Sequence, residues 1–259
     1  MLFVLRRATS LVLATIMITA VLRLHAQRTV AYTCAVKPAS FALKTRDLPV
    51  WELGGGVLFT AGMTVDADGA PNAYGPKNKG LDYTANARGA HGWAALVTNK
   101  QGNPVLQKRG PYRGFYVSTT SLEQRDVKDE ANPKRYLDAR TIPYVALPRD
   151  FAERFGIALG DMLVVFNEAN GRSAYAIYAD VGPRGKIGEG SIALAKALGM
   201  SADPRHSQAF GHITYLIFPS SGATGWNRIT PARIRSEATK LHYQWIRETT
   251  FCYVNAEER

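Results

Sequence analysis

Residues 175–199 read YAIYADVGPRGKIGEGSIALAKALG and place a strand, a tight turn and a helix in immediate succession. The apolar and aromatic residues at the start of this stretch favour a β-strand that ends at Asp180. Residues 181–190 hold four glycines and one proline, a composition typical of a turn. An alanine-rich helix is predicted over 191–198, because a serine stands in its capping position and a glycine follows its end. The stretch therefore predicts short elements joined by tight connections.

Similar short apolar runs recur on both sides of this stretch, and turn residues bound each of them. These runs cover 57–59, 93–97, 115–118, 144–147, 162–166, 174–179 and 213–218. Their aromatic and β-branched content favours a sheet or barrel over βαβ units. Asn170-Gly171 lies between two runs and predicts a hairpin turn, because both residues tolerate positive φ. Two further helices are predicted, over 149–155 and 231–247.

The N-terminal residues have the pattern of a secretory signal peptide. Arg6 and Arg7 precede an apolar run over 10–22, and a small residue, Ala26, closes the segment. The alternative is an uncleaved membrane anchor, but Arg23 interrupts the run short of the roughly 20 apolar residues that a span requires. We therefore predict a signal peptide over 1–26 and a secreted or periplasmic protein.

The remaining chain is long enough for one sizeable core, and no linker divides it. We predict an irregular leader over 27–56, followed by a single catalytic domain over 57–259. The chain carries 32 Lys plus Arg and 21 Asp plus Glu, a formal charge of +11, and loss of the three arginines in 1–26 lowers it to +8. The basic residues are scattered, which favours a solvated basic surface over nucleic-acid binding. We expect a monomer without membrane contact after signal cleavage.

Cys34 and Cys252 are the two cysteines of the chain and lie toward its opposite ends. In an oxidising compartment such a pair can close a long loop as a disulfide. The alternative is two buried thiols, since pairing geometry cannot be read from a sequence. We predict the disulfide.

Asp180 and Glu189 are the residues with the strongest chemical signal. Asp180 follows apolar residues, so burial is expected to disfavour its charged form. Glu189 lies beside the start of the helix predicted at 191, where the helix dipole is expected to favour its charged form. Two carboxyl groups in opposed environments suit acid–base cleavage of a glycosidic bond, with Asp180 as acid and Glu189 as base. The structural alternative is that Asp180 caps the turn and Glu189 is a helix-terminal charge.

This segment resembles the signature of the family-75 chitosanases, in which an Asp and a Glu nine residues apart lie in an A-x-x-x-D…G-E-x-S-x-A-x-A context. The resemblance extends over roughly 57–218, through FTAGMTVDADGAPNAY at 59–74 and GLDY at 80–83. It implies that Asp180 and Glu189 are catalytic, that the enzyme inverts the anomeric centre, and that the substrate is partly or fully deacetylated chitin. It implies no cofactor.

A second pattern, ADVGP at 179–183 followed by SIALAKALG at 191–199, is similar to double-psi β-barrel proteins. These include rare-lipoprotein-A-type lytic transglycosylases and expansin-like modules. The likeness implies a mainly β fold with a six-stranded double-psi-type barrel core and a few peripheral helices. It also leaves an alternative function, peptidoglycan cleavage or non-catalytic glycan binding. Val181, where that pattern has Arg, and Glu189 in the turn both favour the hydrolase.

Further candidates lie in the early part of the chain. Asp66, Asp68, Asp82 and Tyr83 are predicted to bind substrate, the aspartates by attracting sugar ammonium groups. The alternative for Asp-x-Asp-Gly is an Asx-turn, since the motif is too short for an EF-hand. We also expect a locally acidic substrate groove, with acidic residues converging on it and basic residues facing away, because a basic protein otherwise repels a cationic polymer. The five histidines have no metal-ligand spacing, and neither Ser118 nor Ser121 lies in a nucleophile elbow.

Overall fold

The computed structural model describes residues 36–90, 92–206, 210–222 and 225–257. The predicted signal peptide, the start of the predicted leader and Cys34 lie outside these residues, as does the side chain of Cys252. The described residues belong to one compact unit. Within the described part of the chain, none of the helices combines the length and apolar character that crossing a membrane requires.

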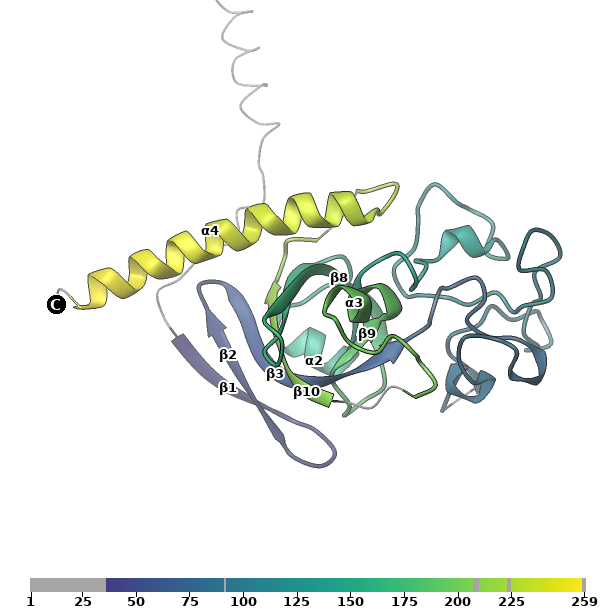
Figure 1. The fold of residues 1–259 in the computed structure, drawn as a ribbon, viewed down its shortest axis with the longest axis horizontal. Helices are drawn as coiled ribbons and strands as arrows, with labels where there is room; N and C mark the ends of the chain where they lie inside the picture. Colours follow the sequence, from purple (N-terminus) through teal and green to yellow (C-terminus); the bar gives the residue numbers. More distant parts are fainter. Residues whose placement is uncertain (1–35, 91, 207–209, 223–224, 258–259) are drawn as a thin grey trace, which may run out of the picture. The chain divides into compact units, whose positions relative to one another are not determined.

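A closed six-stranded barrel forms the centre of the described chain (Figure 1). Its strands, in hydrogen-bonded order, are β3 (Gly56–Asp66), β10 (Phe210–Phe218), β7 (Met162–Asn167), β8 (Arg172–Gly182), β6 (Tyr144–Pro148) and β9 (Glu189–Ser191). A further pairing between β9 and β3 closes the barrel. The β6–β8 and β3–β9 pairs are parallel, and the other barrel pairs are antiparallel. The predicted mainly β fold with a six-stranded barrel is confirmed.

The predicted irregular leader is wrong for its described part. Residues 36–53 form a hairpin of β1 (Val36–Ala42) and β2 (Asp47–Leu53), and β2 pairs with the edge of β3. Leu48 and Val50 are fully buried while the residues between and beside them are exposed. This alternation is the two-residue period of a strand with one buried face. The hairpin extends the barrel sheet and begins before the predicted domain boundary.

Three α-helices lie among the described residues, at the positions predicted. They are α2 (Arg149–Arg154), α3 (Ile192–Ala197) and α4 (Pro231–Glu257). Ser191 caps α3 as predicted, since its Oγ accepts a hydrogen bond from Leu194 N at 3.1 Å. The helix α4 runs ten residues past the predicted end and packs on β7 and β8. The indole of Trp245 donates to the carbonyl of Leu53 at 2.8 Å, which ties α4 to β2.

Two of the predicted strands are largely absent. The run at 93–97 contributes Trp93 to the short pair of β4 (Arg88–Gly89) and β5 (Gly92–Trp93) and Leu96 to an isolated bridge with Ser118, and 115–118 makes only isolated bridges. Ala95, Leu96 and Val117 are nevertheless buried. Short 3-10 helices interrupt this region at Pro76–Asn78, Thr84–Ala87 and Pro133–Arg135. In this region the apolar runs correctly indicated burial, but the backbone does not form a continuous ladder of strand hydrogen bonds.

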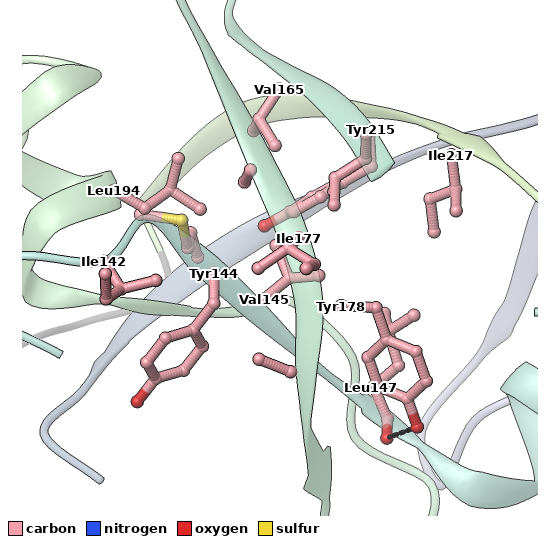
Figure 2. Close-up of a cluster of buried hydrophobic side chains, with 14 of the residues drawn as sticks. Ile142, Tyr144, Val145, Leu147, Val165, Ile177, Tyr178, Leu194, Tyr215 and Ile217 are labelled. Carbon is pink, nitrogen blue, oxygen red and sulfur yellow. Dashed lines mark hydrogen bonds between the residues drawn. The ribbon is translucent and has the colours of Figure 1, made fainter. Parts of the chain in front are cut away.

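The barrel core links directly to the candidate site through Tyr144. Figure 2 shows Val145, Ile177 and Tyr215 among the buried side chains, while the Tyr144 hydroxyl points away from this cluster. That hydroxyl donates to Asp66 Oδ2 at 3.0 Å. A fully buried tyrosine needs a partner for its hydroxyl. The apolar core therefore ends at a carboxylate.

Candidate active site

Asp180 and Glu189 lie on either side of one residue of β6. In the β6–β8 pair Asp180 lies opposite Ala146, and in the β6–β9 pair Glu189 lies opposite the same alanine. Residues in register on neighbouring strands point to the same face, and two strand spacings amount to roughly 9.6 Å. A register shift between Val145 and Ala146 brings Asp180 opposite Ala146, as β-bulges commonly re-aim a side chain. The small alanine leaves open space between the two carboxyl groups.

Both carboxyl groups line a single cleft with a volume of about 1340 Å³. Its acidic residues are Asp66, Asp68, Asp82, Asp150, Asp180 and Glu189. Its basic residues are Lys44, Arg88, Arg154, Arg184, Lys186 and Arg205. Acidic residues do converge on the cleft, but the expectation that the basic residues face away from it is wrong, because an equal number of cations lines the same cleft. The two sets differ in exposure, because three of the six acids are buried and the other three half-buried, whereas five of the six cations are exposed.

One oxygen of Asp180 is held by three donors. Its Oδ1 accepts hydrogen bonds from Ser121 N at 3.0 Å, from Ser121 Oγ at 2.7 Å and from Val181 N at 2.8 Å. Burial raises the pKa of Asp180, as expected, and these three hydrogen bonds oppose that shift by stabilising the carboxylate. The contact between Ser121 and Asp180 could not be predicted from the sequence, because the two residues are 59 positions apart and Ser121 lies in no recognisable motif.

The environment of Glu189 differs from the one expected. Burial raises its pKa, the positive charge of Lys186 lowers it, and the negative charge of Asp180 raises it further. The expectation that the helix dipole would favour the charged form is wrong. The first turn of α3 is capped by Ser191 instead, and the helix is only six residues long. No described residue donates a hydrogen bond to the Glu189 carboxyl group, so the charge of Lys186 alone opposes the effect of burial on its pKa.

For Asp66 and Asp68 the sequence left two alternatives, a place in the substrate groove and an Asx-turn, and the structure shows features of both. Asp66 Oδ1 accepts a hydrogen bond from Asp68 N at 2.8 Å, which is the Asx-turn, and both side chains also line the cleft. The hydroxyl of Tyr74 donates to Asp68 Oδ1 at 2.6 Å. Burial, followed by the nearby acids, raises the pKa of both aspartates well above 3.8. The DxDG motif thus builds a turn and brings two carboxyl groups into the cleft.

Asp82 reaches the cleft, but Tyr83 is not among its lining residues. Asp82 is held by hydrogen bonds from Tyr83 N at 2.7 Å and from Asn86 Nδ2 at 2.9 and 3.0 Å. The Tyr83 ring is 41% exposed, and the Arg205 guanidinium lies 4.8 Å from its centre. The structure therefore brings together the three predicted aspartates and the predicted catalytic pair, without Tyr83.

Oxygens of Asp66, Asp68 and Asp180 all lie within 4.8 Å of one another. Carboxylate oxygens are ligands for hard cations, but Ca²⁺ takes about 6 to 8 of them. Hydroxyl or amide donors already contact each of these three side chains. Raised pKa values and close hydroxyl groups are what shared protons require among crowded carboxyl groups. The cluster is therefore interpreted as a proton-sharing network.

The buried charge predicts that Asp66→Asn stabilises the protein at neutral pH. Because burial raises the pKa of Asp66, the folded state loses stability as the pH rises above 3.8, the ordinary carboxyl value. The amide can still accept from Asp68 N, and its NH₂ can donate to the Tyr144 hydroxyl. We expect a gain on the order of 1–2 kcal/mol at pH 7, and none at pH 3, in urea unfolding. Asp47→Asn, at the exposed start of β2, is the control, and an equal gain at both pH values would refute the burial argument.

The mainly β barrel brings two buried or half-buried carboxyl groups, Asp180 and Glu189, to one cleft, an arrangement suited to acid–base chemistry. The family model described as fungal chitosanase of glycosyl hydrolase group 75 matches residues 63–248, which is more than half of the chain. The chain belongs to this family. It is thus a chitosanase-type glycoside hydrolase that acts on a polysaccharide, and the resemblance read from the sequence is confirmed. A search of the curated proteins found no match.

Proposed function

We propose that this protein cleaves β-1,4-linked glucosamine polymers internally, by an inverting mechanism that uses Asp180 and Glu189. The observation that carries the proposal is the position of both residues opposite Ala146, facing one cleft. Inverting glycosidases separate their carboxyl groups by about 6.5–9.5 Å, which leaves room for a water molecule. Two strand spacings of roughly 4.8 Å each are compatible with that range.

The hydrogen bonds support Asp180 as the base and Glu189 as the acid, the reverse of the roles expected from the sequence. Three donors stabilise the Asp180 carboxylate, so it ionises before Glu189, and its second oxygen is available to a water molecule. Burial and the charge of Asp180 raise the pKa of Glu189 and help it to keep a proton for the leaving oxygen. The two roles follow from this difference in hydrogen bonding.

The remaining acids supply recognition of the amino sugar. Asp66, Asp68 and Asp82 line the cleft together with the catalytic pair. A sugar ammonium group beside these carboxylates gains charge-assisted hydrogen bonds in a partly desolvated site. An acetylated amine carries no charge and gains none. This difference supports a preference for deacetylated units.

A change at Ser121 tests the assignment of the base. Ser121→Ala removes a hydroxyl that donates to Asp180 Oδ1, so the pKa of Asp180 should rise. The acidic limb of the kcat/KM profile should then move to higher pH, with a rate loss of about tenfold below the optimum. Ser121→Thr keeps the hydroxyl and should restore the profile. An unshifted acidic limb would show that Asp180 is not the base.

The reaction itself is tested by proton NMR of products formed from chitosan, chitin and peptidoglycan. The proposal predicts that chitosan is cleaved fastest and that α-anomers appear first, because inversion at a β-linkage releases the α-anomer. Anhydro-sugar products from peptidoglycan would instead identify a lytic transglycosylase. Initial β-anomers would indicate a retaining mechanism.

We also propose export, with removal of residues 1–26 and a disulfide between Cys34 and Cys252. The positive start, apolar run and Ala26 support the cleavage site. Intact-mass measurement of the protein recovered outside the cytoplasm should give a chain that begins at Gln27 and lacks two hydrogens. A mass that includes the signal segment would refute cleavage, and a mass without the two-hydrogen loss would refute the disulfide.

A further inference from the structure

The cations of the cleft are more exposed than its acids. Two turns supply three of them, Lys44 from the β1–β2 turn and Arg184 and Lys186 from the β8–β9 turn. All three side chains are exposed, whereas Asp66 and Asp180 are buried. We refer to Lys44, Arg184 and Lys186 as the basic rim.

The two turns that form the basic rim are joined. Lys44 N donates to the carbonyl of Gly185 at 3.3 Å, and the Lys44 side chain lies where a Cβ of Gly185 would stand. Gly185 has a φ of +71°, which favours glycine, and its missing side chain lets the Lys44 side chain pack against the turn that carries Arg184 and Lys186. The three cations of the basic rim therefore come from two turns that contact each other directly.

The charges of the basic rim are largely available to a ligand. Among the described residues, no carboxylate lies within ion-pair distance of Lys44 or Lys186. Arg184 pairs with Asp150 at 3.3 Å, but the Arg184 side chain is 91% exposed. An exposed ion pair of this kind contributes little and can be exchanged for a ligand's carboxylate.

This arrangement suits neither a simple polycation nor a simple polyanion. Chitosan carries a positive charge on each deacetylated sugar and would be repelled by the rim. A polyanion would be repelled by the acids around Asp180 and Glu189. A glycan that carries both charges satisfies the two sets at once, with ammonium groups at the buried acids and carboxylates at the exposed cations.

We propose that the basic rim binds carboxylate groups on the glycan, so that the preferred substrate is an amino-sugar polymer that also carries carboxylates. The proposal rests on the proposed function and specifies its substrate class. Lys186 also affects the pKa of Glu189. The test therefore compares two substrates on the same variant, because any change in the chemical step cancels in that ratio.

The experiment measures kcat/KM on chitosan and on O-carboxymethyl chitosan of matched length and free-amine content. Wild-type protein should prefer the carboxymethyl polymer by about tenfold at low salt, and the preference should fall as salt is added. The variant Lys44→Gln/Arg184→Gln/Lys186→Gln should lose that preference. The matched control is Arg235→Gln/Lys240→Gln/Arg247→Gln on α4, which removes three exposed charges outside the cleft and should keep it.

Measuring the binding of chitosan and of O-carboxymethyl chitosan compares the two polymers without catalysis. Calorimetry with Glu189→Gln should show about tenfold tighter binding of the carboxymethyl polymer, and the added rim substitutions should abolish the difference. Equal binding of both polymers, or a preference that survives removal of the rim, overturns the inference. Cleavage of chitosan together with such a result would leave the proposed function intact. Absence of cleavage on every amino-sugar polymer would refute the proposed function. The binding measurement would still show whether the basic rim binds carboxylate groups.

Discussion

Glu189→Gln should lower kcat/KM on chitosan by a factor of about 10²–10⁴, the usual contribution of a general acid. The amide has the shape of the carboxyl group but cannot give a proton to the leaving oxygen. Asp180→Asn should lose a similar factor, because an amide cannot take a proton from the attacking water. Reducing-end assays measure the activity of both variants, after each has been shown to fold like the wild-type protein. Asp150→Asn, which also lines the cleft but pairs with Arg184, is the control and should keep most of the activity.

A substrate with a good leaving group separates the two roles. A chitooligosaccharyl β-fluoride needs little protonation, so Glu189→Gln should recover most of its lost rate on this substrate. Asp180→Asn should stay slow, because the attacking water still requires a base. The opposite result, with recovery in Asp180→Asn, would restore the roles expected from the sequence. Near wild-type activity of either variant on chitosan would remove that residue from the mechanism.

Gly188→Ala should disrupt both stability and catalysis. Gly188 has a φ of +92°, and an added Cβ would collide with the carbonyl oxygen of Gly62 in β3. The strained φ and the overpacking together should lower the free energy of unfolding by about 2–5 kcal/mol. Because Glu189 follows directly, its carboxyl group should shift and kcat/KM should fall by about 10²-fold. Urea unfolding and the reducing-end assay measure the two effects.

Gly171→Ala provides the matched control for this change. Gly171 lies in the β7–β8 turn with a φ of +71°, and an added Cβ would meet nothing within 4 Å. This variant should therefore lose only the free energy of unfolding that comes from the unfavourable φ, about 1–2 kcal/mol. It should keep its activity. Similar losses in the two variants would mean that the approach of Gly188 to β3 does not position Glu189.

Much of the barrel could be predicted because its strands are apolar along their length. The runs at 144–147, 162–166 and 213–218 became β6, β7 and β10 with shifts of a few residues at most. A strand buried on both faces leaves a continuous apolar signal in the sequence. The β1–β2 hairpin was missed because it buries only one face, so polar residues interrupt its signal. The run at 115–118 was assigned to a strand because burial alone does not specify backbone pairing.

The amino-acid sequence by itself determined the family, the chemical types of the candidate site residues and the turn that joins Asp180 to Glu189. These properties reside in contiguous residues and are readable without distant neighbours. Tertiary structure alone decided the protonation preferences, because they depend on burial and on donors such as Ser121, which lies 59 residues from Asp180. It also decided that Lys44 joins Arg184 and Lys186 at the rim, since strand pairing brings those two turns together.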